Sequence, residues 1–187
     1  MIAKPKLCML LFLSSEGVFF LLLLLSFVYF RQSPVNPHGA TIKALDVGRT
    51  SIFTACLLSS SLTVWLATRS LKRGNHGALR LWLLATFALG ATFLYGEITE
   101  YLGMIDKHVS ISRDVFSSAF FTVTGLHGIH VTAGLLALLI LLILAQGGDF
   151  KDGRGAVAVD TVSIYWHFVD GVWAVLFSTV YLWTLFS

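Results

Sequence analysis

The sequence predicts an all-α integral membrane protein, a single bundle of five transmembrane helices. Of its 187 residues, 56% are hydrophobic and only 12% are charged, and the mean hydropathy is +0.81. A soluble domain carries about a quarter charged residues because its surface faces water. A helix needs about 20 apolar residues to cross the hydrocarbon core of a bilayer. Five stretches reach that length, at about 7–30, 50–69, 79–101, 115–145 and 158–186.

The first stretch imitates a signal peptide, because Lys4 and Lys6 precede a leucine-rich run. The apolar run is about 24 residues long, however, whereas the apolar region of a signal peptide has about 7–15. The residues that follow it, Phe30-Arg31-Gln32, also lack the small-x-small pattern of a cleavage site. We therefore expect 7–30 to be a retained first span.

Polar segments separate the other stretches. Residues 31–49 contain two prolines and several polar side chains, 72–77 read KRGNHG, and 146–155 read QGGDFKDGRG. Glycine and proline in such segments end helices and form turns. No separator is long enough for a soluble domain, so 1–187 is expected to form one membrane domain.

The distribution of basic residues predicts the orientation. Cytoplasmic loops of membrane proteins are enriched in Lys and Arg. The side that holds the N-terminus carries eight of these residues and the opposite side carries five, which favours an N-terminus inside and a C-terminus outside. The first group is Lys4, Lys6, Arg69, Lys72, Arg73, Arg80, Lys151 and Arg154, and the second is Arg31, Lys43, Arg49, Lys107 and Arg113.

Several classes of function find no support in the sequence. No cluster of Lys and Arg with interleaved aromatic residues indicates nucleic-acid binding. Cys8 and Cys56 lie in apolar runs without Cys-x-x-Cys or Cys/His spacing, so they predict neither zinc nor a disulfide framework. No nucleophile motif, phosphate loop or zinc-protease motif is present.

Ionisable residues inside the predicted spans are the strongest candidates for a functional role. Such groups are costly in a membrane and usually face the interior of a bundle. Most of them form i,i+3 pairs, which occupy one face of a helix. They are Glu16 in the first span, Glu97 and Glu100 in the third, His127 and His130 in the fourth, and His167 and Asp170 in the fifth.

A helix rises about 1.5 Å per residue, so the depth of each group follows from the expected span boundaries. Four groups reach similar depths near the middle of the membrane and are expected to meet there: Glu16, His127, His167 and Asp170. His130 is expected one turn further in, and Glu97 and Glu100 near the outer edge.

Three interpretations of this polar cluster remain open. Histidines with carboxylates are a ligand set for iron or zinc. Glu16 would be the titrating group if the cluster relayed protons. Alternatively, the side chains form hydrogen bonds between helices and fix the geometry of the bundle. Gly125, Gly128 and Gly134 would allow a neighbouring helix to approach the fourth span closely.

Four motifs, in order along the chain, carry a family resemblance. LSSEGVFF (13–20), EITEY (97–101), SSAFFTVTGLHGIHVTAG (117–134) and YWHFVDGVWAVLFSTVYLW (165–183) resemble segments of subunit III of haem-copper terminal oxidases. The resemblance covers nearly the whole chain and all five predicted helices.

The resemblance implies a subunit without a catalytic centre, metal or redox cofactor of its own. Haem and copper are then expected in partner subunits, and this chain would pack on the catalytic subunit I, support proton uptake and stability, and bind phospholipids. Glu16 would correspond to the buried helix carboxylate of the family. His127, His130, His167, Asp170 and Glu100 would correspond to its polar framework.

The chain also departs from parts of the family pattern. The mitochondrial type has seven helices, so five imply a bacterial complex in the plasma membrane, fed by cytochrome c or quinol. Glu97 stands where mitochondrial relatives carry Gln, and Gly171 replaces a bulkier apolar residue, which would leave a gap or admit a neighbouring side chain. The alternatives are an accessory subunit of a nitric oxide reductase and an autonomous metal-binding membrane enzyme.

Overall fold

The structure, a computed structural model, describes residues 4–32, 46–109, 111–112, 115–147 and 154–183. Every regular element in these ranges is helical, so the predicted all-α fold is confirmed for them. The helices are α1 (Lys4–Gln32), α3 (Val47–Lys72), α4 (His76–Asp106), α5 (Val115–Gly147) and α6 (Arg154–Phe177), and α6 continues into a π-helical turn, η2 (Ser178–Leu182).

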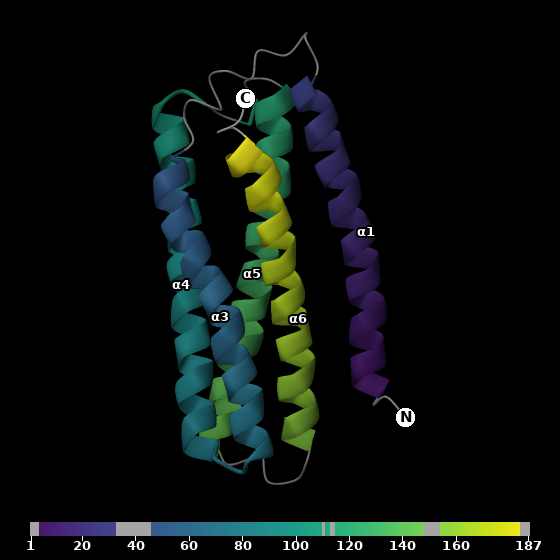
Figure 1. The fold of residues 1–187 in the computed structure, drawn as a ribbon, viewed down its shortest axis with the longest axis vertical. Helices are drawn as coiled ribbons and strands as arrows, with labels where there is room; N and C mark the ends of the chain where they lie inside the picture. The colour runs from purple at the N-terminus through teal and green to yellow at the C-terminus, as the bar shows by residue number, and fades with distance from the viewer. Residues whose placement is uncertain (1–3, 33–45, 110, 113–114, 148–153, 184–187) are drawn as a thin grey trace.

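Successive helices run in opposite directions along one long axis (Figure 1). α3, α4, α5 and α6 pack around one another, and α1 lies along their side against α5 and α6. α1 begins near one end of the bundle, and α6 finishes near the opposite end. These are the lower end and the upper end, respectively, in Figure 1.

Local capping sets the boundaries of α3 and α4. The side chain of Asp46 accepts a hydrogen bond from the backbone N–H of Arg49 at 3.0 Å, and Asn75 accepts one from Ala78 at 3.0 Å. Short polar side chains at this position satisfy backbone donors that the first turn leaves unpaired. Between the two helices Gly74 adopts φ +70°, a left-handed conformation that favours glycine. The separator expected at 72–77 is therefore shorter, because His76 already belongs to α4.

α4 also extends further than expected at its other end. It continues to Asp106, whereas the predicted span ended at 101. Glu97 and Glu100 therefore lie inside the helix rather than at its end. Glu97 is only 7% exposed.

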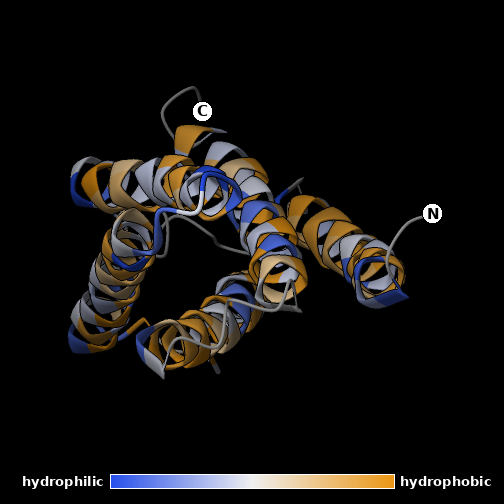
Figure 2. Ribbon diagram, turned by 90° about the horizontal axis from the view of Figure 1, so that it is seen from below, coloured by the Kyte–Doolittle hydropathy of each residue, from blue (hydrophilic) through white to orange (hydrophobic). Residues whose placement is uncertain are grey.

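Four helices, α1, α3, α4 and α5, are long and apolar enough to cross a membrane. α6 falls outside this set of four, and it carries Asp160 and Asp170. Apolar residues cover much of every helix in the end-on view of Figure 2. The described residues thus form a multi-pass membrane protein, while the fifth span remains a prediction.

Glycines on α4 and α5 accommodate the largest side chains of the core. A Cβ atom at Gly90 or at Gly134 would lie 2.7 Å from the ring of Trp166, which is fully buried. At Gly128 it would lie 2.9 Å from Glu97 Oε2. Close approach at Gly128 and Gly134 was expected from the sequence, and the groups that use it are side chains of neighbouring helices.

Candidate functional site

The polar side chains inside the bundle form several contacts between helices. The first joins α1 to α5, where His130 Nε2 lies 3.1 Å from Glu16 Oε2. His130 Nδ1 lies 2.8 Å from the carbonyl oxygen of Leu126. A carbonyl only accepts, so Nδ1 carries a proton and donates it. Nε2 is therefore the ring nitrogen that faces the Glu16 carboxyl group.

A second contact joins α3 to α6. Ser61 Oγ donates to Asp170 Oδ2 and lies 3.1 Å from His167 Nδ1. With its hydrogen directed to Asp170, Ser61 accepts from His167. Asp170 is 2% exposed, and no described residue bonds its Oδ1. His167, by contrast, is exposed.

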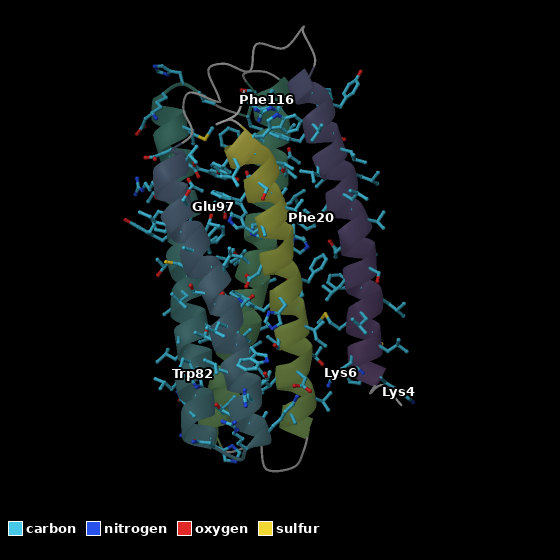
Figure 3. The ribbon with its side chains drawn as sticks, in the orientation of Figure 1. Lys4, Lys6, Phe20, Trp82, Glu97 and Phe116 are labelled. Carbon is cyan, nitrogen blue, oxygen red and sulfur yellow. The ribbon has the colours of Figure 1, made fainter. Side chains whose placement is uncertain are left out.

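The third contact joins α4 to α5 in the upper half of the bundle, where Figure 3 labels Glu97. Tyr101 Oη lies 2.6 Å from Thr124 Oγ1 and 3.5 Å from Glu97 Oε1. Among the described residues Glu97 Oε2 has no hydrogen-bond partner. One oxygen of a buried carboxyl group is therefore left without a partner in the part of the chain that the structure describes.

His127 has the most enclosed position of the predicted site residues. Its exposed fraction is 0%, and neither ring nitrogen has a partner in the described part of the chain. The imidazole stacks on Trp173 with centroids 4.9 Å apart and meets the edge of Phe93 at 5.9 Å. The contacts of His127 are thus aromatic rather than hydrogen-bonded.

Glu100 bonds to the end of α6. The Oη of Tyr181 donates to Glu100 Oε2 at 2.9 Å. Tyr181 is 1% exposed and lies in the π-helical turn η2. π-Helical turns widen the helix locally and recur at functional positions.

The structure divides the expected mid-membrane cluster into separate contacts. It brings Glu16 to His130 rather than to His127, and it brings His167 and Asp170 together through Ser61. Within the described ranges no three His, Cys, Asp or Glu residues lie close enough to hold a metal ion.

Sequence reasoning missed the hydroxyl groups of α3. Trp166 Nε1 donates to Ser60 Oγ at 2.8 Å, and Trp173 Nε1 donates to Thr54 Oγ1 at 3.0 Å. A partial signal was available, because Thr50 and Thr54 are four residues apart, and Ser60 follows Thr54 by two steps of three through Leu57 along the buried side of α3.

We call these contacts the interhelical polar framework. It comprises Glu16–His130, Ser61–His167–Asp170, Glu97–Tyr101–Thr124, Glu100–Tyr181, Trp166–Ser60 and Trp173–Thr54. It links all five helices and ties polar groups to one another in an apolar setting. Fold and framework together define the class: a multi-pass helical membrane protein with an internally bonded polar core.

Comparison with known proteins identifies the family. Residues 3–185 match the family described as cytochrome c oxidase subunit III. The cytochrome c oxidase subunit 3 of Corynebacterium diphtheriae is 36% identical over 172 residues, which cover 91% of this chain and 83% of the relative. The cytochrome bo(3) ubiquinol oxidase subunit 3 of Pseudomonas aeruginosa is 39% identical over 149 residues, 79% of this chain and 69% of the relative. The chain belongs to the cytochrome c oxidase subunit III family and is a subunit III of a haem-copper oxidase.

Proposed function

We propose that the chain serves a bacterial haem-copper oxidase as a scaffold that packs on catalytic subunit I, in the plasma membrane. Haem and copper would reside in the partner subunits, and electrons would come from cytochrome c or quinol. The observation that carries this proposal is the 3.1 Å contact between Glu16 and His130, which joins residues of two family motifs across α1 and α5. In such a contact the polar side chains bond to each other and hold two helices together.

We also propose that the chain crosses the membrane five times and that its N-terminus lies inside. The alternating directions of the five helices support an odd number of crossings, since α1 begins near the lower end and α6 finishes near the upper end (Figure 1). The turn between α3 and α4 carries Lys72 and Arg73 at the lower end, and basic residues favour the cytoplasmic side. Lys43, Arg113 and Lys151 lie outside the described residues.

A groove between α1 and α6 supports the proposed binding of phospholipid. Its volume is about 360 Å³, and apolar side chains such as Phe20, Phe168 and Leu176 line it together with Gly17 and Gly171. A Cβ at Gly171 would meet no atom within 4 Å, so the gap expected there is present. An acyl chain has the shape and apolar character for this groove.

The proposal is tested by capture of the complex. An affinity tag is placed on this chain, membranes are cross-linked before mild detergent, and the product is analysed by mass spectrometry and a reduced-minus-oxidised spectrum. We expect haem bands and a large multi-span partner joined to the chain. Cross-links to proteins that carry no haem, or a metal retained by the chain alone, would contradict the assignment.

The same complex tests whether Glu16 supports proton uptake. Glu16→Gln keeps a hydrogen-bonding group opposite His130 but removes the ionisable carboxyl group. We expect an assembled oxidase with slower turnover. Normal turnover and normal proton stoichiometry in this variant would reject a relay through Glu16 and leave the scaffold role intact.

A further inference from the structure

Two neighbouring cavities lie where α3 begins and α4 finishes. The outer one has room of about 100 Å³ and is lined by charged and polar residues, including Asp46, Arg49 and Lys107 at an exposed rim. The inner one has room of about 10 Å³ and is lined by Glu97 and Trp173 among others. The two share four lining residues, Thr50, Phe53, Gly96 and Glu100. The inner cavity is therefore adjacent to the outer one, on its side toward the interior of the bundle.

The inner cavity ends at an unsatisfied polar group. Glu97 is 93% buried, and its Oε2 has no partner among the described residues. Leaving a buried polar atom without a hydrogen bond is unfavourable, so a partner of some kind is favoured. Glu97 is one of the residues that line the inner cavity, which offers space for such a partner.

The size of the inner cavity limits which molecule can bond to Glu97 there. A cavity needs about 10–15 Å³ of room to hold one water molecule, and the water needs two to four polar neighbours. The inner cavity offers about that room, with Glu97, Glu100 and Thr50 as polar neighbours. It is too small for an organic ligand.

We propose that these cavities form a water inlet, which admits exchangeable water from the upper end of the bundle to Glu97. Water in the inner cavity bonds the free oxygen of Glu97, and the outer cavity connects it to the aqueous phase. The inlet adds an internal hydration site to the scaffold role and does not depend on which oxidase the chain serves.

Charged and titratable groups from three elements face the inlet. Asp46 and Arg49 come from the start of α3, and Arg49 also donates to Thr99 Oγ1 at 3.3 Å. α4 and its C-terminal cap supply the second group, and η2 supplies the phenol bonded to Glu100. Among the described residues the lining groups of this kind are Asp46, Arg49, Glu97, Glu100 and Lys107, and Tyr101 and Tyr181 bond to Glu97 and Glu100.

The chain offers an internal comparison that tests the inlet. Trp173 and Trp166 are equally buried, at 1% and 0% exposed, but Trp173 lines the inner cavity and Trp166 lines neither cavity. Hydroxyl radicals formed from bound water by a brief X-ray pulse oxidise adjacent side chains. The intact complex is mixed with H₂¹⁸O, pulsed, and digested for mass spectrometry. We expect ¹⁸O on Trp173 and none on Trp166.

A blocking variant and a matched control locate the route. Gly103 lines the outer cavity, and a Cβ there would meet no atom within 4 Å, so Gly103→Leu fills the inlet without a clash. Gly77 is exposed at the start of α4, lines neither cavity, and a Cβ there would make only an ordinary contact with Asn75 Oδ1 at 3.6 Å. The ¹⁸O label on Trp173 should be lost in Gly103→Leu and retained in Gly77→Leu, with haem content unchanged in both.

Two results would overturn the inlet. One is an unlabelled Trp173 in the unaltered complex, which would mean that no exchanging water reaches the inner cavity. The other is full labelling of Trp173 in Gly103→Leu, which would mean that water arrives by another route. The haem content of the same samples reports separately on the scaffold proposal.

Discussion

The attachment of α1 differs from the packing of α3 to α6. Within the four-helix part, the fully buried ring of Trp166 packs against Gly90 and Gly134, and the rings of Trp166 and Trp173 both donate to hydroxyl groups of α3. α1 instead exposes much of its apolar surface, with Leu11, Leu22 and Leu25 each more than half exposed.

Three polar contacts spaced along α1 hold it in place. Near its start Lys6 Nζ lies 2.6 Å from Asp160 Oδ2, and in the middle Glu16 meets His130. Near its end the guanidinium of Arg31 lies 4.9 Å from the centre of the Trp183 ring. α1 also packs on the bundle through Leu13, Phe20 and Phe27, which are buried, but it lies beside an open groove. The two parts should therefore respond differently to substitution.

The largest effect is expected where packing is tightest. Gly134→Ala would place a methyl group 2.7 Å from Trp166 and 3.2 Å from Tyr165. Overpacking of a core costs about 1–3 kcal/mol, so thermal denaturation of the purified complex should begin at a clearly lower temperature. Gly171→Ala, where a methyl group has open space, is the matched control and should leave the midpoint unchanged. Equal midpoints for the two variants would contradict the difference in packing.

An intermediate effect is expected at the middle contact of α1. A double-mutant cycle with Glu16→Ala and His130→Ala should give a coupling energy of about 1 kcal/mol, because hydrogen bonds between membrane helices rarely exceed that by much. The same cycle with His127→Ala in place of His130→Ala should give no coupling. Coupling to His127 instead would support the arrangement predicted from the sequence.

The smallest effect is expected at the ion pair near the start of α1. Lys6 and Asp160 are 29% and 23% exposed, and exposed ion pairs contribute about 0.2–1 kcal/mol. Lys6→Ala should lower the stability slightly at low ionic strength and not at all in high salt, where the charges are screened. Lys4→Ala, at an exposed position two residues away, serves as the control. A loss that persists in high salt would mean that Lys6 contributes through packing.

The fold class could be predicted because long apolar runs separated by glycine and charged residues leave few alternatives. Helix ends were harder to place, since capping by Asp46 and Asn75 depends on the local backbone. The gap at Gly171 was predictable for a simple reason, the absence of a side chain on an otherwise bulky helix.

The partner of Glu16 could not be predicted, because depth was measured against a fixed bilayer thickness. α5 has 33 residues, so at about 1.5 Å per residue it is close to 50 Å long rather than 30 Å. The depth of a residue counted from one end of α5 then disagrees with the depth counted from the other end. The disagreement is far larger than the rise of about 4.5 Å along the helix between His127 and His130. The pairing is set by the relative shift of α1 and α5, which the sequence does not contain.

The long separation between Glu16 and His130 has a consequence for biogenesis. The two residues are 114 positions apart, and chains are synthesised at about 5–20 residues per second, so Glu16 waits roughly 6–23 seconds for its partner. During that interval the carboxyl group of Glu16 has no His130 to bond. The contact that joins the middle of α1 to the bundle can therefore form only after α5 has been made.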